Sequence, residues 1–104
     1  MENLSKLREL EYLNLALNNI TLIEDLANCE NLNKLDLTCN FIEAKDYIKS
    51  LFNLKKCQSI RELYLLGNPC TDFKEYRKLA IAIVPQLIII EGKEIKPSER
   101  IQAK

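Results

Sequence analysis

Leucine and isoleucine residues recur in the same order at three places along the chain. The three copies read Leu10-Glu-Tyr-Leu-Asn-Leu-Ala-Leu-Asn-Asn-Ile20, Leu32-Asn-Lys-Leu-Asp-Leu-Thr-Cys-Asn-Phe-Ile42 and Ile60-Arg-Glu-Leu-Tyr-Leu-Leu-Gly-Asn-Pro-Cys70. All three fit Leu-x-x-Leu-x-Leu-x-x-Asn-x-Leu, with Ile or Cys in some aliphatic slots. They begin 22 and then 28 residues apart, at positions 10, 32 and 60. The spacing predicts a repeat protein in which each copy forms a short strand, a turn and a returning segment.

Residues of the predicted strands alternate between two faces of a sheet, because successive side chains of a strand point to opposite sides. The inward positions are leucines, and the outward positions line the concave surface of the stacked repeats. These outward residues are Tyr12, Asn14 and Ala16, then Lys34, Asp36 and Thr38, then Glu62, Tyr64 and Leu66, with Ile89 and Glu91 at the edge. We expect this face to bind another protein, with Tyr64 and Leu66 as the best anchors. The alternative is that these are ordinary strand residues and a partner binds elsewhere.

One asparagine occurs at the same place in each copy, at Asn18, Asn40 and Asn68. A polar side chain in an apolar interior is tolerated where it pairs with backbone groups that a turn leaves without partners. We therefore predict that the three asparagines form a structural ladder and do not contact a ligand.

The extra residues of the second copy predict an α-helix within 43–59. Tyr47, Ile48, Leu51 and Phe52 follow the spacing of one helical face, which we expect to be buried. The lysines on the rest of this helix, Lys45, Lys49, Lys55 and Lys56, favour a solvated face over a site for an anionic partner. The shorter first copy is expected to return through a 3₁₀-like turn over 23–26.

After the third copy the pattern changes into a predicted cap. Asp72 and Glu75 have the spacing of a capping box at the start of a helix. The apolar residues Phe73, Tyr76, Ala80, Ile81 and Val84 then form one stripe, and Pro85 ends the helix. A fourth, degenerate strand follows over 87–92, with Ile95 where the other copies have asparagine.

These elements predict one α/β domain over residues 1–104, a solenoid with a short parallel β-sheet on the concave face and helices or 3₁₀ turns on the convex face. The repeats are expected at about 4–25, 26–53 and 54–80, the cap at about 71–97 and a short tail at 98–104. The first unit (Leu4, Leu7, Leu10, Leu13 and Leu15) has no unit before it, so its aliphatic flank is expected to be open. Further repeats ahead of Met1 are the favoured explanation, and weak self-association through this end is the alternative.

The composition of the chain argues against several classes of function. The formal net charge is zero and histidine is absent, which argues against nucleic-acid binding and against histidine-based catalysis. No apolar run has the roughly 20 residues of a membrane span. Cys29, Cys57 and Cys70 take aliphatic slots and Cys39 lies in a turn, so thiols are favoured over a Cys29–Cys57 disulfide. The sequence thus predicts a non-catalytic protein without a cofactor or a metal site.

Three stretches resemble a known family most specifically. They are 10–20, Lys34-Leu-Asp-Leu-Thr-Cys-Asn-Phe-Ile42, and Gly67-Asn-Pro-Cys70 together with Gly92-Lys-Glu-Ile-Lys-Pro-Ser-Glu-Arg100. With Tyr76-Arg77 and Pro85-x-Leu87-x-x-Ile90 in the cap, they are similar to the tilB-type leucine-rich-repeat proteins, which act in cytoplasmic preassembly of axonemal dynein arms. Members of that family carry further repeats before this region and, after it, a charged helical stretch and a β domain. This chain therefore looks like the central repeats and cap of a longer protein.

The resemblance implies partners and a location. The partners would be dynein assembly factors and dynein chains, with chaperones as a further class. The location would be the cytoplasm of a ciliated or flagellated cell, or the cilium or flagellum itself. A phosphatase-regulatory module that binds a catalytic subunit on the same concave face is the alternative within this fold. One departure is Glu91, where the family's cap commonly has Asp.

Overall fold

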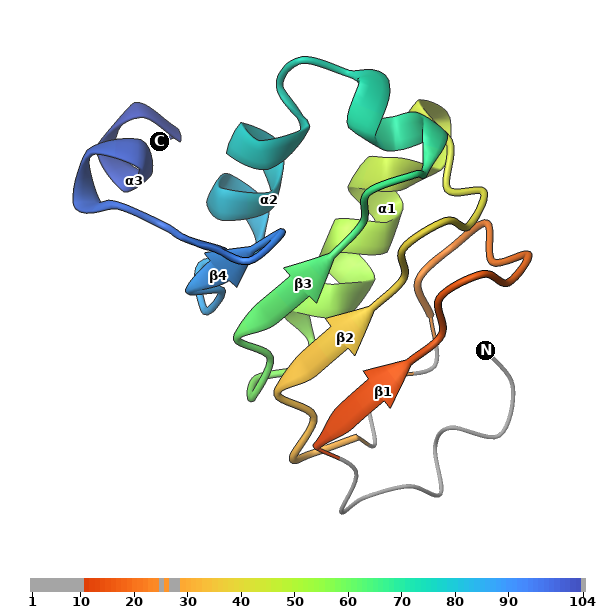
Figure 1. The fold of residues 1–104 in the computed structure, drawn as a ribbon. Coiled ribbons are helices and arrows are strands. Elements are labelled where there is room, and N and C mark those ends of the chain that lie inside the picture. Colours follow the sequence, from red (N-terminus) through yellow and green to blue (C-terminus); the bar gives the residue numbers. More distant parts are fainter. Residues whose placement is uncertain (1–10, 25, 27–28, 104) are drawn as a thin grey trace.

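The computed structural model describes residues 11–24, 26 and 29–103 of the chain. Its sheet has five short strands in chain order, β1 (Tyr12–Asn14), β2 (Lys34–Asp36), β3 (Glu62–Tyr64), β4 (Ile89–Ile90) and β5 (Lys93–Glu94). The first four are parallel (Figure 1). Strand β5 pairs with β4 antiparallel. Leu13 pairs with Leu35, Leu35 with Leu63 and Leu63 with Ile90. The repeat alignment predicted from the sequence, including the degenerate fourth strand, is confirmed.

Helices line one side of the sheet, and the last helix lies past its β4 end (Figure 1). They are α1 (Ala44–Lys55), the 3₁₀ helix η2 (Pro69–Asp72), α2 (Tyr76–Ile83) and α3 (Pro97–Ala103). The α/β solenoid with a helical convex side is therefore confirmed. The sequence assigned 98–104 to a short tail, whereas α3 covers most of this segment and packs against α2.

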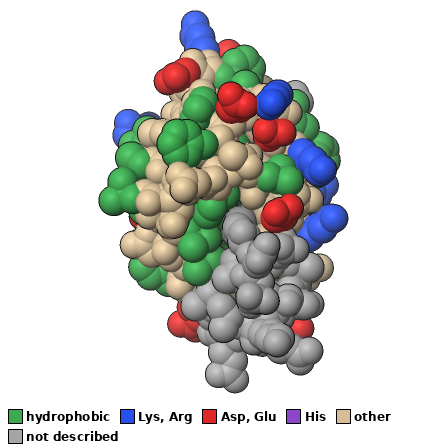
Figure 2. All heavy atoms as spheres, turned by 90° about the vertical axis from the view of Figure 1, so that its right-hand side faces the viewer, with side chains coloured by type: hydrophobic (Ala, Val, Ile, Leu, Met, Phe, Trp, Pro, Cys, Tyr) green, Lys and Arg blue, Asp and Glu red, His purple; other side chains and the backbone are tan. Residues whose placement is uncertain are grey.

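Apolar and charged side chains are distributed unevenly over the surface. Figure 2 shows Lys and Arg side chains gathering along one edge of the face that it views, with apolar side chains over the opposite edge. The large apolar residues exposed on the described part of the chain are Tyr12, Leu17, Phe41, Ile48, Phe52, Leu66, Phe73, Ile88 and Ile101.

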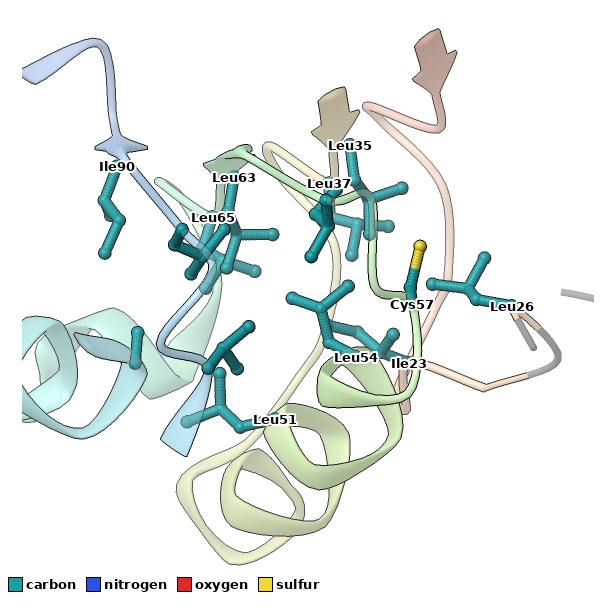
Figure 3. Packing of buried hydrophobic residues seen from close by; sticks show 14 of the residues in the cluster. Ile23, Leu26, Leu35, Leu37, Leu51, Leu54, Cys57, Leu63, Leu65 and Ile90 are labelled. Carbon is teal, nitrogen blue, oxygen red and sulfur yellow. The ribbon is translucent and has the colours of Figure 1, made fainter. Parts of the chain in front are cut away.

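The core lies between the sheet and the helices. Leu51 and Leu54 project from α1 into an interior that Leu35, Leu37, Leu63 and Leu65 line from the strand side (Figure 3). These side chains are fully buried, and Ile23, Ile42, Ile60, Val84, Leu87 and Ile90 extend the same cluster. Because each repeat contributes to one continuous core, none of them buries its leucines without its neighbours.

Asparagine side chains join neighbouring turns. Asn68 is buried, and its Nδ2 donates to the carbonyls of Leu37 and Leu65 at 2.8 Å each, while its Oδ1 accepts from the Ile42 amide at 3.1 Å. Asn40 repeats this arrangement one turn earlier, with the Leu15 and Leu37 carbonyls and the Ile20 amide. Asn18 is exposed and donates within its own turn, to the carbonyls of Leu15 and Ala16. Asn40 and Asn68 thus each connect two repeats.

The turn before each of these asparagines requires a left-handed backbone. Leu17, Cys39 and Gly67 occupy the same column and have φ of 60°, 58° and 85°. Glycine is needed in the third turn, because a Cβ on Gly67 would lie 2.8 Å from the Cys39 sulfur and 3.1 Å from the Cys39 Cα.

The buried face of α1 differs from the predicted one. Tyr47, Ser50, Leu51 and Leu54 are buried, whereas Ile48 and Phe52 are about half exposed, so the prediction that these two face the core is wrong. Ser50 is accommodated because its Oγ accepts the Ile23 amide at 3.0 Å. Asn53 donates to the Ile23 carbonyl at 2.7 Å from the same side. These bonds to the first repeat set the rotation of α1 about its axis.

The predicted capping box before α2 is also wrong. Pro69 starts η2, Asp72 is its last residue, and α2 begins only at Tyr76 with Glu75 at a cap position that makes no side-chain cap hydrogen bond. Phe73 therefore precedes the helix and is exposed. Proline at the first position of a helix is preorganised for it, which explains the early start.

A tight turn and two arginine side chains hold the cap together. Glu91 and Gly92 form the two-residue turn between β4 and β5, both with positive φ, as a type I′ turn requires. Arg77 of α2 donates to the Ile90 carbonyl at 3.1 Å and to Glu99 of α3 at 2.7 Å. Arg100 donates to the carbonyls of Pro85 and Leu87. Arginine side chains of α2 and α3 thus bond to other parts of the cap.

Some sequence predictions lie outside the described residues. Leu4, Leu7 and Leu10, on which the open amino-terminal flank depends, are among them, as is Asp25 in the proposed 3₁₀ turn over 23–26.

Candidate functional site

The outward side chains of the parallel strands lie on one face of the sheet. Pairing places Tyr12, Lys34, Glu62 and Ile89 in one row and Asn14, Asp36 and Tyr64 in the next. Ala16, Thr38 and Leu66 come two residues later in their repeats. The structure therefore brings together the nine residues proposed from the sequence, and we call this set the concave face (Tyr12, Asn14, Ala16, Lys34, Asp36, Thr38, Glu62, Tyr64 and Leu66).

A lysine on the concave face lies between two tyrosine rings. The Lys34 ammonium lies 4.9 Å from the ring centroid of Tyr12 on β1 and 5.2 Å from that of Tyr64 on β3. Both distances are within the range in which a cation is attracted to an aromatic ring. The Tyr64 hydroxyl donates to Glu62 Oε2 at 3.0 Å, which fixes the other end of the ring. Three strands thus hold two tyrosines and a lysine in one arrangement.

At the end of each strand, a side-chain oxygen on this face accepts hydrogen bonds from backbone amides. Asn14 Oδ1 accepts the Ala16 amide at 3.0 Å, and Asp36 Oδ1 accepts the Thr38 amide at 3.0 Å and the Thr38 hydroxyl at 2.6 Å. Tyr64 has no carboxylate for this role in the third repeat. Glu91 of the cap supplies it, accepting the Leu65 amide at 2.9 Å and the Leu66 amide at 3.3 Å.

Strand alternation predicts Glu91 at the edge of the face, but it does not predict this contact. The sequence does contain one indication of this contact. Asn14 and Asp36 carry side-chain acceptors at equivalent positions of the first two repeats, whereas the third repeat has Tyr64 there. Burial raises the pKa of Glu91, and the amides of Leu65 and Leu66 oppose that rise. Burial, and then the hydrogen bond to Glu62, raise the pKa of Tyr64, so both groups on the face are shifted toward their protonated forms.

An open hollow of about 480 Å³ adjoins the concave face at the start of the strands. It is bordered by Glu11, Tyr12, Asn31, Asn33, Lys34 and Ser59. The exposed Tyr12 ring and the Lys34 ammonium thus stand beside space that a partner side chain could enter.

The cysteines contribute packing. Cys29, Cys57 and Cys70 are buried, whereas Cys39 is exposed. Burial raises the pKa of each of these three thiols, to about 12 for Cys70, which suppresses the nucleophilic thiolate. Within the described ranges, no group of three or more His, Cys, Asp or Glu residues is arranged to hold a metal ion. None of the helices described is long and apolar enough to cross a membrane.

Parallel strands in register, inward leucines and a recurrent asparagine that ties one turn to the next define a leucine-rich-repeat solenoid. Residues 1–104 match the leucine-rich repeat family, and the chain belongs to it.

The chain is also similar to curated proteins, two of which are named for dynein assembly. It is 54% identical over 104 residues to "Dynein axonemal assembly factor 11" of Mus musculus and 56% identical over 103 residues to the protein of that name of Homo sapiens. It is 50% identical over 103 residues to "Protein tilB" of Drosophila melanogaster. Each alignment covers 99% of this chain but only 21%, 22% and 25% of the respective relative. The chain thus spans about a fifth to a quarter of their length, and the family resemblance drawn from the sequence is confirmed over this part.

Solved structures of other proteins share the fold. One is the Drosophila melanogaster SNF/U2A′ complex, with a TM-score of 0.66 and 22% identity, covering 99% of this chain and 72% of that one. Another is the Chaetomium Mex67:Mtr2 structure, with a TM-score of 0.66 and 26% identity, covering 94% of this chain and 64% of that one.

Proposed function

We propose that this chain is a protein-binding module of a factor that assembles axonemal dynein arms before they enter the cilium or flagellum. Two relatives that are 54% and 56% identical to this chain and are named "Dynein axonemal assembly factor 11" support this proposal. The partners would be dynein chains or other assembly factors in the cytoplasm.

The observation that carries the proposal is the Tyr12–Lys34–Tyr64 arrangement on the concave face. Aromatic residues dominate contact energies at protein interfaces, and a side chain that is already ordered loses less entropy when it binds. Tyr64 is held by Glu62 and Lys34 before any partner arrives. Leu66, which is 54% exposed, offers apolar area at the end of the same strand.

The charge of the face limits the partner's chemistry. Asp36, Glu62 and Glu91 lie on three neighbouring repeats, and Lys34 is the lysine among them. A partner segment with basic and apolar side chains would meet complementary groups here, because opposite charges across an interface favour encounter and register.

Affinity capture from ciliated cells tests the proposal. The complete protein carrying Tyr64→Ala should recover at least tenfold less dynein chain or assembly factor than the unchanged protein, because a hot-spot residue contributes about 2 kcal/mol or more. The matched control is Ile101→Ala, which removes an exposed apolar side chain on α3, away from the sheet.

Equal recovery by the Tyr64→Ala protein and the unchanged protein would remove the concave face as the binding site. Recovery of a phosphatase catalytic subunit, with neither dynein nor an assembly factor, would favour the phosphatase-regulatory alternative.

A further inference from the structure

Helix α1 exposes two large apolar side chains on its outer side. Ile48 is 48% exposed and Phe52 is 50% exposed. They are four residues apart, so they are neighbours on the helix surface. The core does not need them, because Tyr47, Leu51 and Leu54 already fill the inward face of α1.

The neighbours of α1 show where this apolar pair lies. Ser50 and Asn53 turn toward the first repeat, where they bond to Ile23. Tyr47 turns the other way, and its hydroxyl donates to the Tyr76 carbonyl of α2 at 2.6 Å. Because an α-helix turns by 100° per residue, Ile48 lies 100° further around the helix axis than Tyr47, in the direction away from Ser50. Ile48 and Phe52 therefore occupy the outer surface of α1 on the side nearer α2.

Lysines surround the pair. Lys45 is three residues before Ile48, Lys49 is three before Phe52, and Lys55 and Lys56 are three and four after it, all exposed. Residues at these spacings are surface neighbours on a helix. The acidic residues on or beside α1 are Glu43, which pairs with Lys45 at 3.5 Å, and the half-buried Asp46. The surface is thus an apolar pair inside a basic border.

We propose that this outer surface of α1 is a second docking surface, which binds an acidic amphipathic helix of a protein partner. Two apolar side chains of that helix, one turn apart, would cover Ile48 and Phe52, and flanking carboxylates would face Lys45, Lys49, Lys55 and Lys56. Charge complementarity selects the acidic partner, since a basic or neutral segment gains nothing from the border. The proposal does not rest on the concave face, which lies on the opposite side of the sheet from α1.

A protein helix fits this surface better than an anionic membrane does. A helix that lies in a bilayer interface buries a complete apolar face in the lipid. The larger apolar face of α1 is committed to the core, which leaves two side chains for an outside contact. Two residues match the few central anchors of a peptide interface.

Selection from a displayed library of random 16-residue peptides tests the proposal on the whole chain. The enriched peptides should carry two apolar residues at a spacing of three or four, flanked by Asp or Glu. Phe52→Ser should weaken their binding at least tenfold, and the double change Lys45→Glu with Lys49→Glu should do the same. Raising the salt concentration from about 0.05 M to about 0.5 M should weaken binding by the unchanged chain, because it screens exposed charges.

Matched controls separate the surface from general effects. Leu17→Ser removes an apolar side chain that is 81% exposed, and Lys93→Glu reverses an exposed charge on β5; neither should alter binding. Tyr64→Ala should also leave binding of the selected peptides unchanged. The proposal for α1 and the proposal for the concave face can therefore be refuted independently of each other. Circular dichroism melts establish that each variant is folded.

Three results would overturn the proposal. One is enrichment of peptides without acidic residues. Another is binding that Tyr64→Ala abolishes and Phe52→Ser leaves intact. The third is binding to vesicles of phosphatidylserine and phosphatidylcholine that Phe52→Ser abolishes, which would assign the surface to a membrane.

Discussion

The two ends of the described stack are closed to different extents. At the carboxyl end, Ile90 and Leu87 are fully buried, and Arg77 and Arg100 bond the cap to itself. In the first described repeat, Leu13 and Leu15 are only partly buried, and the bonds of Asn18 to other described residues stay within its own turn. The same sequence pattern therefore has a different energetic value at each end of the stack.

The two ends differ in how many neighbouring repeats a residue at an equivalent position contacts. Asn68 satisfies backbone groups of two repeats, whereas the bonds of Asn18 stay inside one. A solenoid is stabilised by nearest-neighbour interfaces, so a residue contributes according to the contacts its neighbours provide. Substitutions in equivalent columns measure this difference directly.

The largest contrast is expected between the two ends of the aliphatic column. Ile90→Ala should lower the free energy of unfolding by about 2–5 kcal/mol, because it leaves a cavity in a fully buried site. Leu13→Ala, in the same column, should cost about 1–2 kcal/mol, because part of its side chain already contacts water. Urea melts followed by circular dichroism give both values. Equal losses would show that the two ends are equally closed.

The asparagine column should show the next contrast. Asn68→Ala leaves the Ile42 amide and the Leu37 and Leu65 carbonyls without their partner, at about 1–3 kcal/mol for each buried group that water cannot reach. Asn18→Ala should cost less than about 1 kcal/mol, since water replaces its bonds at an exposed site. The comparison uses the same denaturant melts. A larger loss for Asn18→Ala than for Asn68→Ala would contradict the order.

A smaller effect is expected for the charged contacts of the cap. Arg77→Gln should destabilise the chain by about 1–2 kcal/mol, because it weakens bonds to the Ile90 carbonyl and to Glu99 at a partly exposed site. Amide hydrogen exchange should report the loss first in α3. Lys78→Gln is the matched control, since Lys78 pairs with Glu75 at 3.5 Å on an exposed surface and should change little.

The smallest effect is a pH dependence confined to the cap. The Arg77 hydrogen bond lowers the pKa of Glu99 from its ordinary 4.5 to about 2. A carboxyl with a lowered folded-state pKa contributes stability that is present above the ordinary pKa and is lost as the pH falls through the folded value. The α3 amides should therefore lose protection from about pH 4.5 down to about pH 2, and Arg77→Gln should remove that dependence. Unchanged α3 amide signals over this range, followed by NMR, would contradict the role of the pair.

Some of the candidate site follows from sequence and some does not. Tyr12, Lys34 and Tyr64 could be placed on one face, because strand alternation and repeat alignment fix direction and register together. Their cation–ring contacts could not, since these depend on side-chain conformations. The Glu91 contact was hidden for a different reason, since its acceptor role serves amides 25 and 26 residues away in the chain.

The spacing of the leucines and asparagines by itself determined the repeat, the register of the four parallel strands and the order of the core columns. Only the tertiary structure decided which flank of α1 is buried. Residues 47–54 contain two overlapping apolar stripes, and the bonds from Ser50 and Asn53 to Ile23 choose between them. The periodicity of apolar residues predicts which residues share a face of a helix. Whether that face is buried depends on a segment distant in sequence that packs against it. For this reason the sequence pattern did not predict that Ile48 and Phe52 are exposed.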